Sequence, residues 1–335
     1  MNPDIASQNS GLTAEIPAET PMETPAKPPT ETTAAEANKS HQNRLDNISD
    51  QTGKSSDDHH LAADLAKRAG ELLMDLRSKT TEIIATEYLA SKRQASKNVE
   101  STNSENVAFW NTHFAILADL KAKGDRLSHE FLVAELQAAR PHDIVLSEEG
   151  RNDPRRLTAE RVWILDPLDG TREFGDPPRD DWAVHVALLE DGELAAGAVA
   201  LPARGITLST AGPPALPSVA KPNIPRVIAS RSRPGPVPHA IAELLNGELL
   251  CLGSAGAKAM SVVLGEADIY AHTGGQYEWD SAAPVAVARA AGCHTSRIDG
   301  SPLRYNQPNV YLPDLLICRP EWATQALAVA ALCVL

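Results

Sequence analysis

Carboxylates stand at the edges of three apolar segments in this 335-residue chain. They occur in Ser147-Glu148-Glu149, in Asp166-Pro167-Leu168-Asp169-Gly170-Thr171 and in Trp279-Asp280-Ser281-Ala282-Ala283. At such edges carboxylates can converge without being buried unpaired. Hard divalent cations such as magnesium prefer clustered oxygen ligands, and phosphate chemistry uses such cations. Together the three segments predict a magnesium-dependent phosphatase.

The middle segment carries most of this prediction. Two metal ions roughly 3.5–4 Å apart can activate a water and stabilise a leaving oxygen, and holding them requires a carboxylate that bridges both. Asp166 and Asp169 could provide the bridge and its neighbour. Leu168 is expected to point its side chain into the core and leave its carbonyl oxygen as a further hard ligand. Gly170 would let the backbone approach a phosphate closely.

Each segment by itself has a simpler explanation. The Asp-Gly pair at 169–170 is also typical of an ordinary turn with an aspartate cap. Glu148 and Glu149 alone would be a solvated surface pair, and Asp280 alone a helix N-cap. The occurrence of all three segments after predicted strands favours the metal site.

The composition indicates one large folded part and an extension. Hydrophobic residues make up 42% of the chain, which is ample for a large core. Residues 1–56 contain no aromatic residue and are rich in Pro, Thr, Glu and Ala, so we expect a disordered extension. Residues 57–335 are expected to form the phosphatase domain, with one half over about 57–215 and the other over about 216–335. No secretory signal and no membrane-spanning run is recognisable.

Charge and cysteine content limit the partners and the location. The formal net charge is −13, and residues 1–60 hold ten acidic against four basic residues. The absence of a basic block argues against a nucleic-acid polymer as partner. The four cysteines lack metal-ligand spacing and stand in apolar contexts, so we expect them to be buried and reduced. A cytoplasmic protein fits.

Periodicity and turn residues predict alternating helices and strands. The clearest element is a hairpin, residues 182–189 and 194–201, around the tight-turn dipeptide Asp191-Gly192. Leucines at helical spacing predict a helix that starts near Asp57, whereas residues 94–124 give no clear pattern. The other predicted strands cover 143–146, 161–165, 226–229, 249–252, 268–272 and 315–318. The other predicted helices cover 127–139, 257–264 and 280–292, with one from about 237 and one at the C-terminus. This pattern indicates a layered α+β architecture.

The three carboxylate segments resemble, in order and approximate spacing, those of the inositol-monophosphatase-like family. Its members are magnesium-dependent, lithium-sensitive phosphatases. They share a Glu-Glu segment, an Asp-Pro-(Leu/Ile)-Asp-Gly-Thr segment and a Trp-Asp-x-Ala-Ala segment. The resemblance covers about residues 58–335. It implies an αβαβα sandwich of the inositol monophosphatase and fructose bisphosphatase type, and relatives are often homodimers.

The resemblance also implies roles for single residues. One metal would be held by Glu148, Asp166 and the Leu168 carbonyl, and a second by Asp166, Asp169 and Asp280. Thr171 resembles the residue that activates the attacking water. Its partner would be Asp125, which alone is also explained as a helix cap. The Thr and Lys that the family carries upstream of this aspartate find no match in residues 94–124, so two or three magnesium ions remain open.

The residues after the Asp-Gly-Thr motif bear on the substrate. Arg172-Glu173-Phe174 resembles the CysQ-type 3′-phosphoadenosine-5′-phosphate phosphatases of sulfate assimilation, as do the stretches at 180–184, 253–258 and 302–306. The resemblance implies hydrolysis of the 3′-phosphate of adenosine 3′,5′-bisphosphate. Arg172, Lys258 and Arg304 are candidates for the second phosphate or mere surface charges. The expected substrate contacts are Glu148, Asp169, Gly170, Thr171, Arg172, Ser254, Lys258 and Asp280.

Two alternatives stay open at this point. One is a different activity of the same family, on inositol monophosphate or fructose 1,6-bisphosphate. The other is a non-catalytic sensor of nucleotide or metal, in which residues 94–124 have lost the water-activating apparatus. The presence of every expected metal carboxylate disfavours the sensor.

Overall fold

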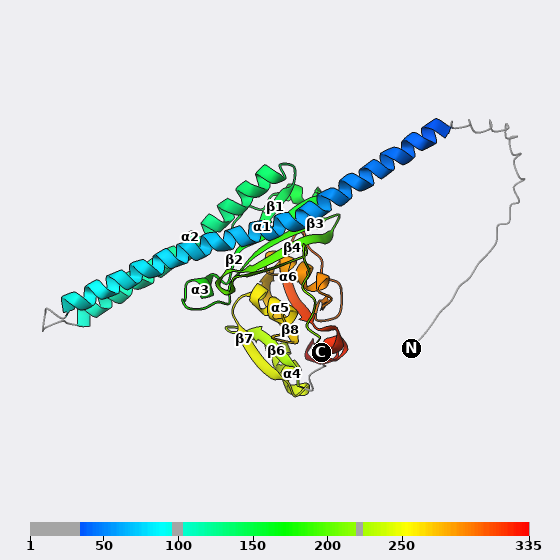
Figure 1. The fold of residues 1–335 in the computed structure, drawn as a ribbon. Coiled ribbons are helices and arrows are strands. Elements are labelled where there is room, and N and C mark those ends of the chain that lie inside the picture. Colours follow the sequence, from blue (N-terminus) through cyan, green and yellow to red (C-terminus); the bar gives the residue numbers. More distant parts are fainter. Residues whose placement is uncertain (1–33, 96–102, 219–223, 335) are drawn as a thin grey trace, which may run out of the picture. The chain divides into compact units, whose positions relative to one another are not determined.

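The computed structural model describes residues 34–95, 103–218 and 224–334. The chain forms two compact units, residues 1–49 and 50–335. Of the first unit, the described part is the beginning of helix α1, Ala34–Ala95. All other elements belong to the second unit (Figure 1). Among the described residues, no helix carries an apolar stretch long enough to cross a membrane.

One sheet is formed by the first five strands along the chain, in the order β1-β2-β3-β4-β5. Strands β1 and β2 are parallel, and the following neighbours pair antiparallel. The bounds are Ile144–Ser147 for β1, Arg161–Asp169 for β2, Ala183–Glu190 for β3, Glu193–Leu201 for β4 and Ile206–Ser209 for β5.

The second sheet has the order β7-β6-β8-β10-β9. Strand β6 is parallel to β7 and β8, whereas β10 is antiparallel to β8 and β9. The bounds are Arg226–Ser230 for β6, Glu248–Leu252 for β7, Ile269–Tyr277 for β8, His294–Ser296 for β9 and Tyr311–Cys318 for β10.

Helices cover both sheets and also separate them. Helices α1 and α2 pack their buried leucines on one face of the first sheet. The space between the sheets holds α5 and α6 (Figure 1). Helices α4 and α7 cover the remaining face of the second sheet. The bounds are Asn103–Ala139 for α2, Thr171–Phe174 for α3, Pro236–Leu244 for α4, Ala255–Val263 for α5, Glu278–Ala290 for α6 and Ala323–Val334 for α7; short 3-10 helices occur at Pro154–Thr158, Pro202–Arg204 and Pro320–Trp322.

This succession of layers confirms the predicted αβαβα sandwich. Strand β2 shows how it arises, because Val162 and Ile164 face the core between the sheets while Trp163 and Leu165 face α1 and α2. A strand covered on both faces reads as a continuous apolar run. The predicted hairpin is also confirmed. Asp191 and Gly192 join β3 to β4 with φ angles of 50° and 81°, as its tight turn requires.

Several predictions on local structure differ from the structure. Helix α1 begins at Ala34, well before Asp57, since no proline interrupts the chain after residue 29 until Pro141. The prediction of disorder for residues 1–33 lies outside the described residues. Helix α2 starts at Asn103 and includes most of residues 94–124, for which the sequence gave no clear pattern. Strands β5 and β9 were not predicted, and β9, with three residues, is too short to show an alternating pattern.

The four cysteines are free, as predicted, but only Cys293 and Cys318 are buried. Cys251 and Cys333 are exposed, which corrects the prediction that all four lie in the core. Cys251 lies on β7, at one edge of its sheet, and Cys333 lies near the end of the terminal α7. An apolar sequence context does not distinguish such edge positions from the core.

Helix α2 approaches the end of β2 closely at Gly124. A Cβ atom there would lie 2.8 Å from Cε1 of Phe174 and 3.0 Å from Cδ2 of Leu168. These contacts are shorter than ordinary packing, so only glycine lets the helix lie this near. The next residue is Asp125, which is therefore brought against the Asp166 to Thr171 segment.

We predict that Gly124→Ala lowers the free energy of unfolding by about 1–2 kcal/mol, measured by chemical denaturation. Overpacking costs about 1–3 kcal/mol, and it outweighs the gain of roughly 1 kcal/mol in helix propensity. Gly212→Ala is the control, because a Cβ there meets nothing within 4 Å. Its effect should stay within about 0.5 kcal/mol. An equally small effect of Gly124→Ala would contradict the close approach.

Candidate metal and phosphate site

The carboxylates of Asp166 and Asp169 lie on the same side of β2 because the strand is irregular there. Asp166 pairs with His185 and Asp169 with Ala183, so the register with β3 shifts between them. In a regular strand, side chains three residues apart point to opposite faces. The extra residue reverses this alternation, as a β-bulge does. Leu168 is thereby turned into the core below α1 and α2.

Asp280 joins them from the first turn of α6. Its Oδ2 accepts a hydrogen bond of 2.6 Å from the backbone N–H of Tyr277. One oxygen each of Asp166, Asp169 and Asp280 lie within 4.8 Å of one another. Glu148 follows β1, and its carboxyl group lies close enough to Asp166 and Asp280 for their charges to act on one another. Three of the four carboxyl groups expected to bind metal therefore form one cluster, and Glu148 lies near it.

Most of these carboxyl groups have raised pKa values. Burial, followed by the charges of Asp169, Glu148 and Asp280, raises the pKa of Asp166 well above its usual range. Burial and then Asp169 raise the pKa of Asp280 to about 6. Glu148 is exposed overall, and burial of its carboxyl group and then the charge of Asp280 raise its pKa to about 7. A divalent cation would displace these protons and offset the repulsion, so the donor set fits magnesium.

Asp169 differs from its neighbours because donors surround it. Its Oδ2 accepts hydrogen bonds from Oγ of Ser254 at 2.5 Å and from the Gly256 N–H at 2.6 Å, and its Oδ1 accepts one from the Ala255 N–H at 3.2 Å. Nε2 of His185 lies 3.1 Å from Oδ2. Burial alone would raise the pKa of Asp169, but the charges and hydrogen bonds of His185, Lys258 and Ser254 lower it to about 2. This carboxylate stays ionised at the N-terminus of α5.

Ser254 has a structural position that the sequence prediction did not foresee. It is the N-cap of α5, where its Oγ accepts a hydrogen bond from the Ala257 N–H at 2.9 Å. The same hydroxyl donates a hydrogen bond to Oδ2 of Asp169. Both capacities of the hydroxyl are used in joining α5 to the end of β2.

We predict that Ser254→Ala lowers the free energy of unfolding by about 1–2 kcal/mol in the absence of added metal, as loss of an N-cap does. Thermal or chemical denaturation measures it. Ser254→Thr keeps the hydroxyl and should recover most of the loss. Equal stability of the alanine variant and the parent would contradict the capping role.

Thr171 and Asp125 meet beside this cluster. Oγ1 of Thr171 lies 3.1 Å from Oδ1 of Asp125 and 3.1 Å from the Leu168 carbonyl oxygen, and both can accept its proton. Burial raises the pKa of Asp125 to about 6. One turn further along α2, Oγ of Ser128 donates to the Pro167 carbonyl at 2.7 Å. The sequence analysis did not identify Ser128, although its spacing from Asp125 places both on one helix face.

A pocket of about 220 Å³ opens next to the carboxylates. Six of the expected residues line it: Asp169, Gly170, Thr171, Arg172, Lys258 and Asp280. The structure does not place Glu148, Asp166, Leu168, Asp125 or Ser254 in that lining, nor the exposed Arg304. Lining residues that the sequence analysis did not find include Ser230, Ser232, Arg233, His272 and Gln276. For Ser230, Ser232, Arg233 and Gln276 the available signal was a position at or near the ends of β6 and β8, where ligand sites of layered folds tend to lie, whereas His272 lies within β8.

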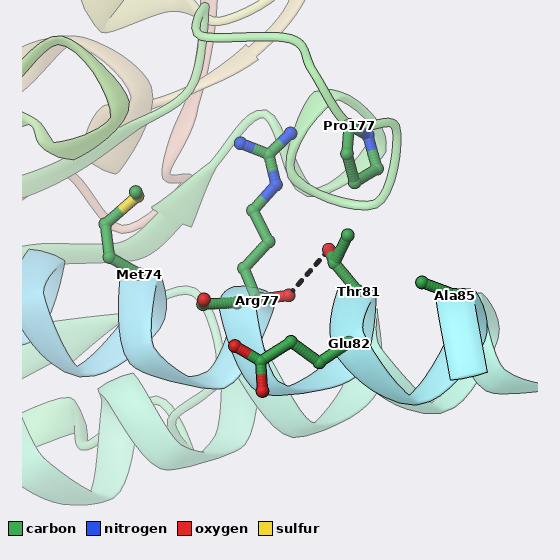
Figure 2. Close-up of a pocket in the computed structure, with 7 residues that line it drawn as sticks. Met74, Arg77, Thr81, Glu82, Ala85 and Pro177 are labelled. Carbon is green, nitrogen blue, oxygen red and sulfur yellow. Dashed lines mark hydrogen bonds between the residues drawn. The ribbon is translucent and has the colours of Figure 1, made fainter.

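Another pocket, of about 370 Å³, lies against α1 and includes Arg77, Glu82 and Pro177. Arg77 extends from α1 toward the loop of Pro177 (Figure 2). Within the helix, Oγ1 of Thr81 donates a hydrogen bond to the backbone carbonyl oxygen of Arg77. The guanidinium donates to the carbonyl oxygen of Glu173 in α3 at 3.3 Å. Its pKa is lowered by burial, against the opposing charges of nearby aspartates. Glu82 is the only carboxylate among the lining residues of this pocket, so it has no cluster to hold a metal. The role of Arg77 is to stabilise α3 through its hydrogen bond to Glu173.

Comparison with known proteins gives the same picture. Residues 56–334 match the model of the inositol monophosphatase family. A Mycobacterium leprae protein named 3′-phosphoadenosine 5′-phosphate phosphatase is 46% identical over 283 residues, covering 81% of this chain and 93% of the relative. A protein of the same name from Mycobacterium bovis is 52% identical over 212 residues, covering 60% of this chain and 78% of the relative.

A solved structure extends the comparison to the fold. It is that of CysQ from Bacteroides thetaiotaomicron, described as a bacterial member of the inositol monophosphatase family. It superposes with a TM-score of 0.58 at 25% identity, covering 79% of this chain and 97% of that one.

Proposed function

The chain belongs to the inositol monophosphatase family, and on that premise we propose that it hydrolyses the 3′-phosphate of adenosine 3′,5′-bisphosphate to give AMP and phosphate. The reaction is that of a magnesium-dependent phosphoric monoester hydrolase. The observation that carries the proposal is the carboxylate cluster of Asp166, Asp169 and Asp280 with the Thr171–Asp125 pair beside it.

The proposed metal ligands are those that the resemblance implied. Glu148, Asp166 and the Leu168 carbonyl would hold one magnesium ion, and Asp166, Asp169 and Asp280 a second. Bound cations supply the positive charge that polarises a phosphate and makes water a better nucleophile. The clustered oxygens and the raised pKa values of Asp166, Asp280 and Glu148 support this assignment.

Thr171 and Asp125 are proposed to prepare the attacking water. Asp125, with a pKa of about 6, can accept the Thr171 proton when ionised, which turns the hydroxyl oxygen's lone pairs toward the pocket. The hydroxyl oxygen can then accept a hydrogen bond from a water molecule and orient it. Gly170 presents backbone without a side chain next to this position, with φ at 87°.

The substrate assignment rests on the relatives and on the pocket. Two mycobacterial relatives carry the name 3′-phosphoadenosine 5′-phosphate phosphatase, and the pocket adds Arg172, Arg233 and Lys258 to the carboxylates. This positive charge suits a second phosphate better than it suits the uncharged hydroxyls of inositol monophosphate. Hydrolysis of inositol monophosphate or fructose 1,6-bisphosphate remains the alternative, and a non-catalytic sensor is less favoured.

A comparison of substrates tests the proposal. Phosphate release is measured with adenosine 3′,5′-bisphosphate, inositol 1-phosphate and fructose 1,6-bisphosphate in the presence of magnesium, with and without lithium. We expect a clear preference for the nucleotide and inhibition by lithium. Preference for either sugar phosphate would refute the substrate while leaving the metal site intact.

The metal site has its own test in Asp169→Asn. We expect activity to fall more than about 100-fold, since loss of even an outer partner of a ligand typically costs 10–100-fold. Magnesium binding measured by calorimetry should be lost in parallel. Asp191→Asn makes the same chemical change in the exposed β3–β4 turn and should leave both unchanged. Retained magnesium binding by Asp169→Asn would refute the ligand assignment.

Two further assignments are part of this proposal. Four free cysteines are compatible with the reducing cytoplasm that we propose as the location. The homodimer that the family resemblance implies stays a prediction. Neither assignment affects the chemistry of the site.

A further inference from the structure

The stretch at residues 302–306, which resembles that of the CysQ-type phosphatases, does not line the pocket. It leads instead to the first turn of α6, where Glu278 is only 1% exposed. The two carboxylate oxygens of Glu278 accept hydrogen bonds from the backbone N–H of Asn306 at 2.5 Å and of Gln307 at 2.7 Å. Both oxygens of this buried carboxylate are thus bound by one loop.

The same loop contacts α6 a second time through Tyr305. Its hydroxyl lies 3.1 Å from Oγ of Ser281, within hydrogen-bond distance, and both side chains are buried. Residues 278 and 281 are nearly one helical turn apart, and Asp280 lies between them. The loop therefore holds the turn that carries this proposed metal ligand at both of its ends.

Asn306 also connects this turn to the first sheet through Arg156. This arginine belongs to the 3-10 helix that follows the Glu148 loop, and its side chain is fully buried. Its Nη1 donates to Oδ1 of Asn306 at 2.7 Å, and Nδ2 of Asn306 donates to the Arg156 carbonyl oxygen at 2.6 Å. Nε of Arg156 donates to Oδ1 of Asn152 at 2.7 Å, which ties the Glu148 loop to the 3-10 helix.

Asn306 stands between two buried charges. Within the described part of the chain, neither Arg156 nor Glu278 forms an ion pair, and a buried charge is costly unless hydrogen bonds satisfy it. Asn306 bonds to Arg156 through its side chain and to Glu278 through its backbone. Its φ of 59° lies in the left-handed region, which asparagine adopts more readily than most residues. One residue thus joins the segment that follows Glu148 to the turn that carries Asp280.

We infer that Asn306 is a positioning residue of the metal site, which sets the place of Asp280 relative to the loop that carries Glu148. This inference rests on the proposed function, in which these two carboxylates hold the magnesium ions from opposite sides of Asp166. Asn306 itself does not line the pocket. Its loss should therefore weaken magnesium binding and leave nucleotide binding at saturating magnesium unchanged.

The test replaces Asn306 with glycine, which adopts a φ of 59° without strain, so that only the side-chain bonds to Arg156 are removed. Magnesium binding to the full chain is measured by calorimetry without nucleotide. We expect the magnesium Kd to rise about 10-fold, the lower end of the range for lost outer partners of metal ligands. The magnesium concentration for half-maximal activity should rise by the same factor, whereas kcat and the nucleotide KM at saturating magnesium should stay as in the parent.

Two further variants make the result specific. Asn246→Gly is the matched control, because Asn246 also has a left-handed φ, of 51°, but is exposed between α4 and β7. It should bind magnesium as the parent does. Tyr305→Phe is a milder change that removes the hydroxyl near Ser281. Its magnesium Kd should rise about two- to fivefold, the effect of losing one neutral hydrogen bond.

An unchanged magnesium Kd in Asn306→Gly, or in Tyr305→Phe where the glycine variant does not fold, would overturn the positioning role. Lower stability to denaturation without a change in Kd would likewise show that Asn306 serves the fold alone. An equal rise in Kd for Asn246→Gly would also contradict the inference. A parent that binds magnesium but does not hydrolyse the nucleotide would instead refute the proposed substrate, since calorimetry needs no substrate.

Discussion

Mutual repulsion of carboxylates is the constraint on which this structure depends. Asp166, Asp169 and Asp280 bring oxygen atoms within 4.8 Å of one another in a largely buried place. Such an arrangement is unfavourable unless surrounding groups hold the chains that carry it. The bulge of β2 belongs to the first sheet, whereas the first turn of α6 and the N-terminus of α5 belong to the helical layer between the sheets, and all three meet here. The layered fold brings their ends together without placing the carboxylates in an apolar core.

Helix α2 holds the same region from the opposite side. Gly124 permits the close approach, Ser128 binds the Pro167 carbonyl and Asp125 binds Thr171. Arg77 of α1 adds a contact to the carbonyl of Glu173. The residues that touch the pocket are therefore supported by contacts that lie outside it. This explains why residues 103–124, which gave no clear pattern in the sequence, still matter for the site.

The sequence allowed prediction of features that have short-range signals. The Asp-Pro-Leu-Asp-Gly-Thr motif, the β3–β4 hairpin and the alternation of elements each follow from residues within a few positions of one another. Arg233, Ser128 and His185 could not be found in this way. Each acts through contacts with residues distant in the sequence, such as Ser128 with Pro167, 39 positions away, and His185 with Trp279, 94 positions away. Ser254 was noticed, but its bond to Asp169 depends on the packing of α5 against β2.

The environment of Asp169 has a consequence for how the site is assembled. This carboxylate is ionised and held by donors from Ser254, Ala255 and Gly256 even without a cation. Folding alone has therefore already fixed its orientation. Metal binding then does not have to bear the entropy cost of ordering this side chain. Asp166, Asp280 and Glu148 differ, because burial and neighbouring carboxylates raise their pKa values. A cation bound as proposed would thus meet one carboxylate that is already ionised and oriented, and three whose protons it must displace.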